Sequence, residues 1–505
     1  MNLGELGTDL APLLAAHVVR QRWYGAKHRD DVELRVLAVE ELREPWPALV
    51  RVVVEATHGD ATPVEAGAGV SRSPEEPGAS DSDPPSARYQ LLLGLRPVEE
   101  AILPTVGESA SVGIVVLPEG TAFAYDALAD PFLALELLRH IAPAHEASSA
   151  RLVSAEQSNS SVVFDERLIL KVFRRLSGAN PEIEVTLALS EWGFSHIADP
   201  VAVWRNNGDD LAVLQRFLTG AVEGWALALT SLRDLLDEGV DPSEAGGDLA
   251  PESERLGVMT AELHLALADV FGTAPGDSRV WADAIAERVR LVDHAELDAD
   301  AIDGAIGTLR SVQDAGVAIR VHGDYHLGQV MRTDDGWYVI DFEGEPSRPL
   351  PERRAPSSPL RDVAGMVRSF AYAAAVGVRE HGEHAGAGGG DIELPSVRLR
   401  APRTPGRPAA AEPPPPRDPA VLAEAWERRN SEAFVDAYLG RLDGSGLLPA
   451  DREAVDRLLT AFQLDKAIYE VAYEQAHRPD WVQIPLAAVQ RLVESGPATP
   501  GRGQP

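Results

Sequence analysis

The stretch between residues 152 and 217 constrains the fold more than any other part of the chain. Two segments rich in β-branched and aromatic residues, 161–164 and 168–173, flank a turn at Asp165 and Glu166. Apolar runs of this length, separated by a two-residue polar turn, predict a pair of antiparallel strands. A domain built around a mainly antiparallel sheet is therefore expected here.

The next elements in this stretch also have clear boundaries. Asn180 is a good N-cap, Pro181 suits the first helical position, and Gly193 is a typical stop, which together predict a helix that ends near residue 192. The dipeptide Asn207-Gly208 then separates two apolar runs, as in a two-residue hairpin. We therefore expect one helix inserted into the antiparallel sheet.

Strands dominate the first part of the chain and helices the second. Further strands are predicted at 32–39, 48–55 and 89–95, a small hairpin between 320–321 and 337–340, and helices at 256–267, 281–292, 301–315, 362–376, 421–442, 452–477 and 486–494. A sheet-rich half followed by a helical half indicates an α+β protein with a cleft between two lobes.

The organisation predicts three regions. They are a cap subdomain at 1–100, an intermediate subdomain with the nucleotide-binding sheet at 101–217, and a helical lobe at 218–500. Two segments, 58–87 and 380–418, contain few large apolar residues and much Gly, Pro and Ser. Such compositions bury too little apolar surface to offset the entropy of ordering, so we expect flexible loops.

Charge and cysteine content exclude several classes of function. The chain has 46 Lys and Arg against 79 Asp and Glu, a formal net charge of −33, which disfavours binding to nucleic acid or to anionic membranes. It has no cysteine, which rules out disulfides and thiolate metal sites and is typical of the reducing cytoplasm. The first residues lack the layout of a signal peptide, and no apolar stretch is long enough to cross a bilayer.

The most informative motif runs from His322 to Gln329, in the sequence HGDYHLGQ, and is followed by DFEG from Asp341. Phosphoryl transfer requires a base for a hydroxyl proton, and an amide oxygen and a carboxylate that hold magnesium over the phosphates. Asp324 is the predicted base, and Gln329 and Asp341 are the predicted metal ligands. Two alternatives remain. The acids could lie in two solvent-exposed turns beside a hairpin, or His322, Asp324 and His326 could form a transition-metal site.

Lys171 lies in the middle of an apolar predicted strand, where an unpaired ammonium group is costly to bury. A lysine that contacts the α and β phosphates of a nucleotide, steadied by a glutamate on the next helix, satisfies this requirement. Both Glu182 and Glu184 suit the start of that helix, so the sequence leaves the partner open. A solvent-facing lysine on an edge strand is the alternative.

The phosphate-binding loop has no glycine-rich motif. Its place between the strands is taken by a polar segment whose hydroxyl groups, on Ser158 and Ser160, can donate to phosphate oxygens. An ordinary polar hairpin is the alternative. His264 we expect to be structural. Asp362 resembles an acid that braces a catalytic loop and starts the next helix, and an ordinary carboxylate at a helix N-terminus is the alternative.

These motifs resemble those of the kinase-like phosphotransferases, and in detail those of the bacterial maltokinases, a family close to the aminoglycoside and choline kinases. The resemblance includes DFEGEP from Asp341, SPLRDVA from Ser358 and, near the amino terminus, RWYGAK from Arg22. Gln329 stands where many such kinases have Asn, and Glu343 is inserted before Gly344. Only the two loop segments fall outside the resemblance.

The resemblance implies a bilobal, protein-kinase-like fold with an amino-terminal cap. It selects Glu184 as the partner of Lys171, and assigns adenine contacts to the hinge around Gln215 and Phe217. Charged and aromatic groups recur on one face of the helix predicted at 452–477, which suits a sugar, and a solvated helix with local ion pairs and aromatic core anchors is the alternative. The resemblance favours sugar binding. The residues expected to contact the acceptor are His322, Asp324, His326, Lys466, Tyr469, Glu470, Tyr473 and Glu474.

The activity implied is transfer of the γ-phosphoryl group of ATP, with Mg2+, to the anomeric hydroxyl of maltose. In the family the product, maltose 1-phosphate, enters α-glucan (glycogen) synthesis from trehalose, often beside trehalose synthase, here in a non-covalent association. The alternatives are a kinase for another sugar or an aminoglycoside, and a catalytically silent nucleotide-binding partner. The silent partner is disfavoured because Asp324, Asp341 and Lys171 are all present.

Overall fold

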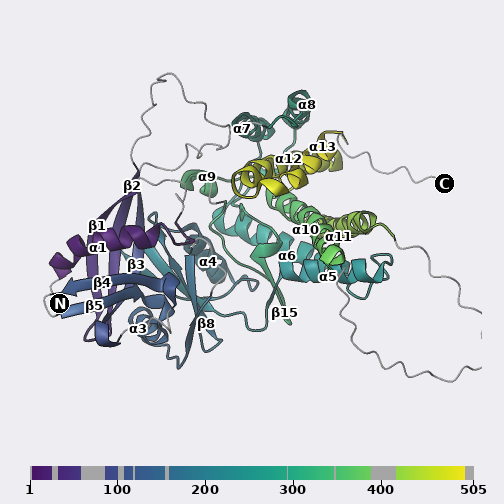
Figure 1. Cartoon of the computed structure of the whole chain (residues 1–505). Coiled ribbons are helices and arrows are strands. Elements are labelled where there is room, and N and C mark those ends of the chain that lie inside the picture. The colour runs from purple at the N-terminus through teal and green to yellow at the C-terminus, as the bar shows by residue number, and fades with distance from the viewer. Residues whose placement is uncertain are drawn as a thin grey trace, which may run out of the picture. The chain divides into compact units, whose positions relative to one another are not determined.

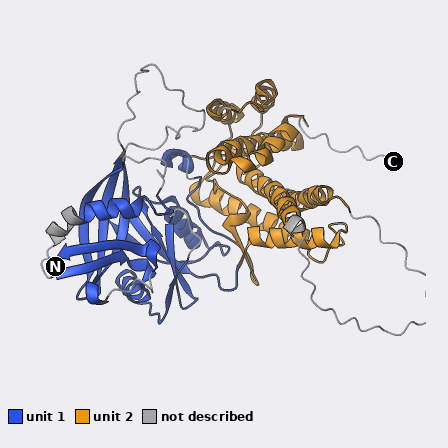
Figure 2. Cartoon of the chain, in the orientation of Figure 1, with its two compact units in different colours: residues 1–221, 339–354 blue, residues 222–338, 355–505 orange. Residues whose placement is uncertain are grey.

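The computed structural model describes residues 3–24, 32–58, 86–100, 107–117, 120–153, 159–292, 294–345, 348–387 and 417–494. The chain divides into two compact units, shown in Figure 2. Unit 1 contains residues 1–221 and 339–354, and unit 2 contains residues 222–338 and 355–505. None of the helices in the described residues is long and apolar enough to cross a membrane.

Unit 1 contains two antiparallel sheets (Figure 1). The first has the strand order β1-β2-β3-β5-β4, with the short β9 paired to β3, and the second has the order β10-β11-β8-β7-β6. The elements of unit 1 are α1 (Leu3–Val18), β1 (Val32–Arg43), β2 (Ala48–His58), β3 (Ser86–Pro97), β4 (Ser111–Leu117), β5 (Gly120–Asp126), α3 (Pro131–Ile141), β6 (Ala150–Leu152), β7 (Asn159–Phe164), β8 (Leu168–Phe173), β9 (Arg175–Leu176), α4 (Pro181–Trp192), β10 (Pro200–Asn206), β11 (Asp209–Arg216) and α9 (Leu350–Arg354).

The alternation of side chains along β2 divides the core of unit 1 into two clusters. Val50, Val52 and Val54 pack with α1 on one face of the first sheet. Leu49 and Val53 face the other way, into a cluster with α3 and the apolar residues of the second sheet. The first sheet is therefore buried on both faces, and the second sheet packs against it through the shared cluster.

The predictions for this region are largely confirmed. Helix α4 begins after the N-cap Asn180, whose side chain accepts from the N–H of Glu182, and ends at Gly193 with a φ of 95°. The hairpin β10–β11 turns at Asn207 and Gly208. Helices α1 and α3 were not predicted from the sequence. Most of the predicted loop 58–87 lies outside the described residues.

Unit 2 is mainly helical. Its elements are β12 (Val222–Glu223), α5 (Gly224–Glu238), α6 (Ala250–Phe271), β13 (Ala274–Pro275), α7 (Ser278–Leu291), α8 (Ala299–Arg310), β14 (Val317–Ala318), β15 (Val330–Thr333), β16 (Gly336–Val339), α10 (Leu360–Ala387), α11 (Pro419–Leu442), α12 (Arg452–His477) and α13 (Gln483–Glu494). The division between the units falls at the end of β16. The helix α6 approaches α11 closely at Gly257, where an added Cβ would lie 2.2 Å from the carbonyl oxygen of Phe434.

Two predictions for unit 2 are wrong. The hairpin in this region is β15–β16, and residues 320–321 do not pair with 337–340, because β14 pairs with β13 and ends at Ala318. The predicted insertion at 380–418 also begins too early, because α10 continues to Ala387. Residues 388–416 of that insertion lie outside the described residues.

Candidate active site

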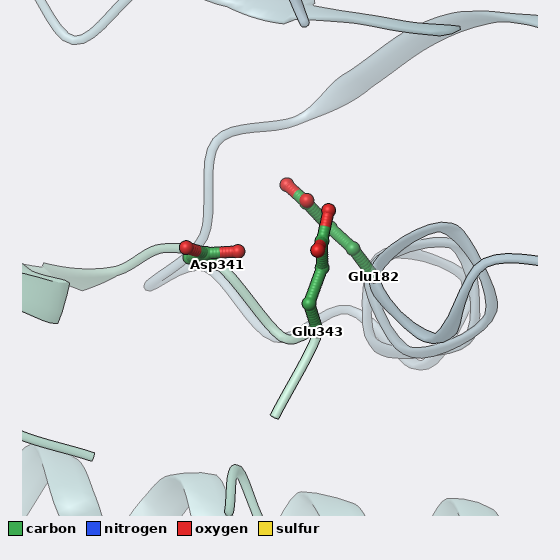
Figure 3. A group of neighbouring side chains, drawn as sticks. All are labelled: Glu182, Asp341 and Glu343. Carbon is green, nitrogen blue, oxygen red and sulfur yellow. The ribbon is translucent and has the colours of Figure 1, made fainter. Parts of the chain in front are cut away.

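Three carboxylates surround the Lys171 ammonium group in unit 1. Its Nζ donates to Oε2 of Glu182 at 2.6 Å and to Oδ1 of Asp341 at 2.9 Å, and it lies 3.7 Å from Oε1 of Glu343. Figure 3 shows Glu182 on α4 and the two other acids on the loop after β16, with their carboxylates turned toward one another. We call these four residues the lysine cluster.

The partner of Lys171 is Glu182, which corrects the assignment to Glu184. Glu184 instead pairs with Arg354, at 2.9 Å between Oε2 and Nε. The reason is helical spacing, because Glu182 shares the buried stripe of α4 with Val185 and Leu189. Residues three and seven positions after Glu182 are apolar, so this stripe was visible in the sequence.

The lysine cluster strongly shifts the protonation of its members. Burial lowers the pKa of Lys171, but the charges of Asp341, Glu182 and Glu343 outweigh burial and hold that pKa well above its ordinary value. Burial raises the pKa of Glu182 to about 8, and the nearby acids contribute in the same direction, against the effect of Lys171. The ammonium therefore stays charged and available to an anionic ligand.

Glu343, the residue inserted before Gly344, is held by two side-chain amides. Its Oε1 accepts from Nδ2 of Asn159 at 3.0 Å and from Nδ2 of Asn180 at 3.4 Å. Asn159 starts β7 and Asn180 caps α4, so the inserted glutamate ties the Asp341 loop to both elements. Asp341 itself has a φ of 65°, a backbone conformation that non-glycine residues rarely adopt and that often marks functional sites.

The strand register corrects the prediction for Ser160. Across the β7–β8 pair, Ser161 lies opposite Lys171 and Ser160 lies opposite Val172. Directly opposed residues share a face of the sheet, so Ser160 faces away from Lys171, and its Oγ accepts from Nε of Arg174 at 2.8 Å. Asn159 and Ser161 are on the face of Lys171. Ser158 lies outside the described residues.

The predicted hinge is only partly free for adenine. Gln215 lies opposite Ile169, on the face of Lys171. The N–H of Phe217, however, donates to the carbonyl of Arg167 at 2.9 Å, and the carbonyl of Phe217 accepts from Thr219. An adenine contact by the Phe217 amide would replace a hydrogen bond within the chain, and the role of both residues stays a prediction.

In unit 2, a buried acid holds the loop that carries Asp324. Asp362, in the first turn of α10, accepts the N–H of His322 at 2.7 Å and the N–H of Gly323 at 2.9 Å. His264 lies 3.2 Å from the same carboxylate through Nε2, and its Nδ1 lies 2.9 Å from the hydroxyl of Tyr438. Burial raises the pKa of Asp362, but its hydrogen bond to His264 and the nearby charges outweigh burial and leave that pKa lowered.

Asp324 and Lys466 form an ion pair within unit 2, although they are far apart in sequence. Nζ of Lys466, on α12, lies 3.1 Å from Oδ1 of Asp324, and both side chains are about one-fifth exposed. His326 is close, with Nε2 3.9 Å from the other carboxylate oxygen. His322 is buried, and its Nδ1 accepts the N–H of Asp324 at 3.3 Å. Gln329 ends the short helix that precedes β15.

The other predicted acceptor residues form a row along α12. Glu470 pairs with Arg368 at 2.7 Å. Glu474 is buried, accepting from the hydroxyl of Tyr372 at 2.6 Å and pairing with Arg478 at 2.6 Å. The ring of Tyr469 has the Lys466 ammonium 4.6 Å from its centre, and Tyr473 is more than one-third exposed. Tyr473 is thus partly exposed, although its ring stacks on that of His477 with 4.4 Å between the ring centres, and the two glutamates are engaged within unit 2.

The lysine cluster also contains suitable ligands for a hard cation. One oxygen from each of Glu182, Asp341 and Glu343 lies within 4.8 Å of the others. Carboxylate oxygens are the ligands that Mg2+ prefers, but the Lys171 ammonium already lies among these three carboxylates, so the magnesium site predicted at Gln329 and Asp341 stays a prediction.

Comparisons with known proteins place these observations in a family. Residues 149–390 match the phosphotransferase enzyme family, and residues 17–130 match the maltokinase N-terminal cap domain. The chain is a maltokinase-like kinase. It is related to the aminoglycoside and choline kinases, as the motifs predicted.

Two relatives of this maltokinase-like kinase are named glucosamine kinases. The one from Mycolicibacterium smegmatis is 28% identical over 375 residues, 70% of this chain and 82% of the relative. The one from Streptacidiphilus jiangxiensis is 28% identical over 389 residues, 72% of this chain and 77% of the relative.

Solved structures confirm the fold. A glucosamine kinase in complex with glucosamine, ADP and inorganic phosphate has a TM-score of 0.57 at 22% identity, covering 95% of this chain and 98% of that chain. A second crystal form has a TM-score of 0.58 at 23% identity, covering 97% and 99%. The predicted fold class, an α+β kinase-like fold with a sheet-rich amino-terminal region and a mainly helical carboxy-terminal region, is therefore confirmed.

Proposed function

We propose that this phosphotransferase transfers the γ-phosphoryl group of ATP to the anomeric hydroxyl of maltose, giving maltose 1-phosphate and ADP. The hydroxyl oxygen forms a bond to the γ-phosphorus, the bond from that phosphorus to the β–γ bridging oxygen breaks, and the hydroxyl proton passes to Asp324. Reactions of this kind are accelerated mainly by positioning and by electrostatic stabilisation. The proposal assigns nucleotide binding to unit 1 and acceptor activation to unit 2.

Unit 1 would bind the nucleotide through the lysine cluster. The Lys171 ammonium is already oriented by Glu182, and its high pKa keeps it charged for contact with phosphate oxygens. Asn159 and Ser161, which share its face, add donors near the same strand. The buried hydroxyl of Ser161 has no hydrogen-bond partner among the described residues, as expected for a donor that a ligand would satisfy.

A magnesium ion would be held by Asp341, with Gln329 as the predicted second ligand. When bound, the ion neutralises charge on the phosphates. Asp341 now accepts from Lys171, so the arrangement of the lysine cluster must change when nucleotide and metal bind together. Glu343, held by its two amides, keeps the Asp341 loop attached to β7 and α4 during that change.

The observation that carries the choice of acceptor is the ion pair between Lys466 and Asp324. The carboxylate that would accept the hydroxyl proton therefore has a cation beside it. The glutamates of the acceptor row, Glu470 and Glu474, have cationic partners too. This part of unit 2 therefore offers little unbalanced negative charge to an amino sugar, and a neutral sugar such as maltose is favoured.

Glucosamine is the second candidate, because two relatives carry that name. The decisive experiment measures magnesium-dependent ADP release from ATP with maltose, trehalose, glucosamine and an aminoglycoside, for the wild type and Asp324→Asn. We expect the highest kcat/KM with maltose and a loss of about 100-fold or more in the variant. Faster turnover of glucosamine would replace the acceptor, and ATP binding without turnover of any acceptor would favour the silent partner.

The expected cytoplasmic location and the non-covalent association with trehalose synthase stay predictions. The location follows from the absence of cysteine, and the association follows from the family resemblance. Co-purification of the two proteins from cells would test the association.

A further inference from the structure

The strand that carries Lys171 is held from its opposite face by residues of the cap, defined from here on as residues 17–130, which match the cap domain. Arg174, directly after β8, is 2% exposed. Its Nη2 lies 2.5 Å from Oδ2 of Asp126, its Nε donates to Ser160, and its guanidinium stands 5.4 Å from the ring centre of Trp23. Asp126 ends β5 and Trp23 belongs to the amino-terminal RWY motif. A buried arginine therefore links the cap to both strands of the β7–β8 pair.

A second link runs through Gln90, a fully buried residue of β3. Its Nε2 donates to the carbonyl of Phe173 and to the carbonyl of Leu211, both at 2.7 Å. Its backbone N–H donates to the carbonyl of Arg174 at 2.8 Å. The Gln90 side chain thus joins β11 to the end of β8, at Phe173, which is two residues after Lys171.

A third link reaches the helix of Glu182. Arg88, also on β3, makes two hydrogen bonds to Asp209, at 2.8 and 2.7 Å, and Asp209 accepts the N–H of Gly178 at 3.0 Å. Residue 178 lies in the segment that leads into α4. The pairing of β3 with β9 covers the chain between β8 and this segment. The cap therefore contacts the supports of both members of the Lys171–Glu182 pair.

We propose that the cap is a positioning element for the nucleotide, and that Arg174 and Gln90 are its positioning residues. They act through β8 and β7 rather than by contact with ATP, because Arg174 and Ser160 lie on the face opposite to Lys171. The buried ion pair of Arg174 with Asp126 favours one geometry, because any other leaves a desolvated charge unpaired, and the two hydrogen bonds from Gln90 Nε2 restrict β8 and β11 further. A displacement of about 1 Å at Lys171 would be enough to weaken phosphate binding markedly. The inference rests on the proposed nucleotide role of Lys171.

The test compares Arg174→Met, Gln90→Met and the milder Asp126→Asn with the wild type, by steady-state kinetics and by calorimetric titration with ADP. We expect the KM for ATP and the Kd for ADP to rise about tenfold in the first two variants, with the KM for the acceptor within about twofold. Arg174→Lys keeps the charge and should recover part of the affinity. Asp126→Asn weakens the ion pair with Arg174 but keeps the turn after β5, so it tests the same contact if Arg174→Met does not fold.

Two controls make the result decisive. Glu55→Gln breaks an exposed ion pair with Arg35 within the same cap sheet and should leave the affinity for nucleotide unchanged. Lys171→Met should raise the KM for ATP by itself; if it does not, the proposed function fails. If Lys171→Met has its effect while the cap variants lower only the fraction of active enzyme at an unchanged KM for ATP, the role of the cap is structural and this inference is overturned.

Discussion

Lys466 holds Asp324 through an ion pair of 3.1 Å that joins residues 142 positions apart in the sequence. The carboxylate comes from the loop before β15, and the ammonium from the middle of α12. The predicted base is thus associated with a positive charge before any acceptor binds. An acceptor hydroxyl can approach this pair, whereas an acceptor ammonium beside the hydroxyl would meet a like charge.

Lys466→Gln should change the choice of acceptor. Removal of the Lys466 ammonium leaves the negative charge of Asp324 unbalanced. The site then no longer repels the ammonium group of an amino sugar, and the Asp324 carboxylate attracts it. We expect the ratio of kcat/KM for maltose to that for glucosamine to fall at least tenfold, measured by ADP release at one pH and ionic strength. Arg457→Gln, which breaks an ion pair with Glu453 on the same helix, is the matched control and should keep the wild-type ratio. An unchanged ratio in Lys466→Gln would contradict a role in specificity.

The two glutamates of α4 should behave very differently. Glu182→Gln removes the buried partner of Lys171, and we expect the KM for ATP to rise about tenfold or more. Glu184→Gln breaks an ion pair with Arg354 that is about one-third exposed, and should change the KM less than about threefold. The double variant Lys171→Met with Glu182→Gln should be little worse than Lys171→Met alone, because the two residues act as a pair. Equal effects of the two single variants would exclude this pairing.

Asp362 should matter for both stability and turnover. Asp362→Ala leaves the amides of His322 and Gly323 and the buried His264 without their acceptor, and we expect a loss of about 3–5 kcal/mol in the free energy of unfolding. Asp362→Asn should lose less of the free energy of unfolding, so that kcat can be measured on folded enzyme. We expect that kcat to be at least tenfold lower than in the wild type. Glu262→Gln, at a half-exposed pair with Arg441, should cost no more than about 1 kcal/mol in urea unfolding.

The stability of the cap should depend on pH through His17. This residue of α1 is 1% exposed, its Nδ1 lies 3.0 Å from the carbonyl of Ser111, and burial lowers its pKa. The unfolded chain then binds a proton more readily than the folded chain, so the free energy of unfolding falls as the pH falls below about 6.5. Thermal melts between pH 7.5 and 5 should show a smaller loss for His17→Gln than for the wild type. His294→Gln, outside the cap, should follow the wild type.

The fold was most predictable where local chemistry marks both ends of an element. Asn180, Pro181 and Gly193 fixed the bounds of α4, and Asn207 with Gly208 fixed a hairpin. The hairpin β15–β16 was misassigned although Asp334 and Asp335 form a two-residue turn just before Gly336, because the apolar run after it was paired with a more distant segment. Helix α3 has an Asp130 N-cap and a Pro at its start, and the same reasoning would have found it.

The candidate site was predictable in its residue types but not in its pairings. Lys171, Asp324 and Asp341 follow from their motifs, whereas the contact of Lys466 with Asp324 depends on how α12 packs in unit 2. The choice of Ser160 over Ser161 failed because a shift of one residue reverses the face of a strand, and the sequence does not fix the register. The amides that hold Glu343 come from β7 and from the cap of α4, so their role appears only in the folded chain.

The pairing of β3 with β9 limits how this protein can be divided or recombined. A cut between the two family matches, after residue 130, would separate Gln90 from the carbonyls of Phe173 and Leu211 and expose the apolar surface between the two sheets. Exposure of that surface would favour aggregation of the isolated kinase part. A cap from one relative should therefore be exchanged for another only together with the strands that it contacts, because the cap and the sheet β10-β11-β8-β7-β6 share one packed interface.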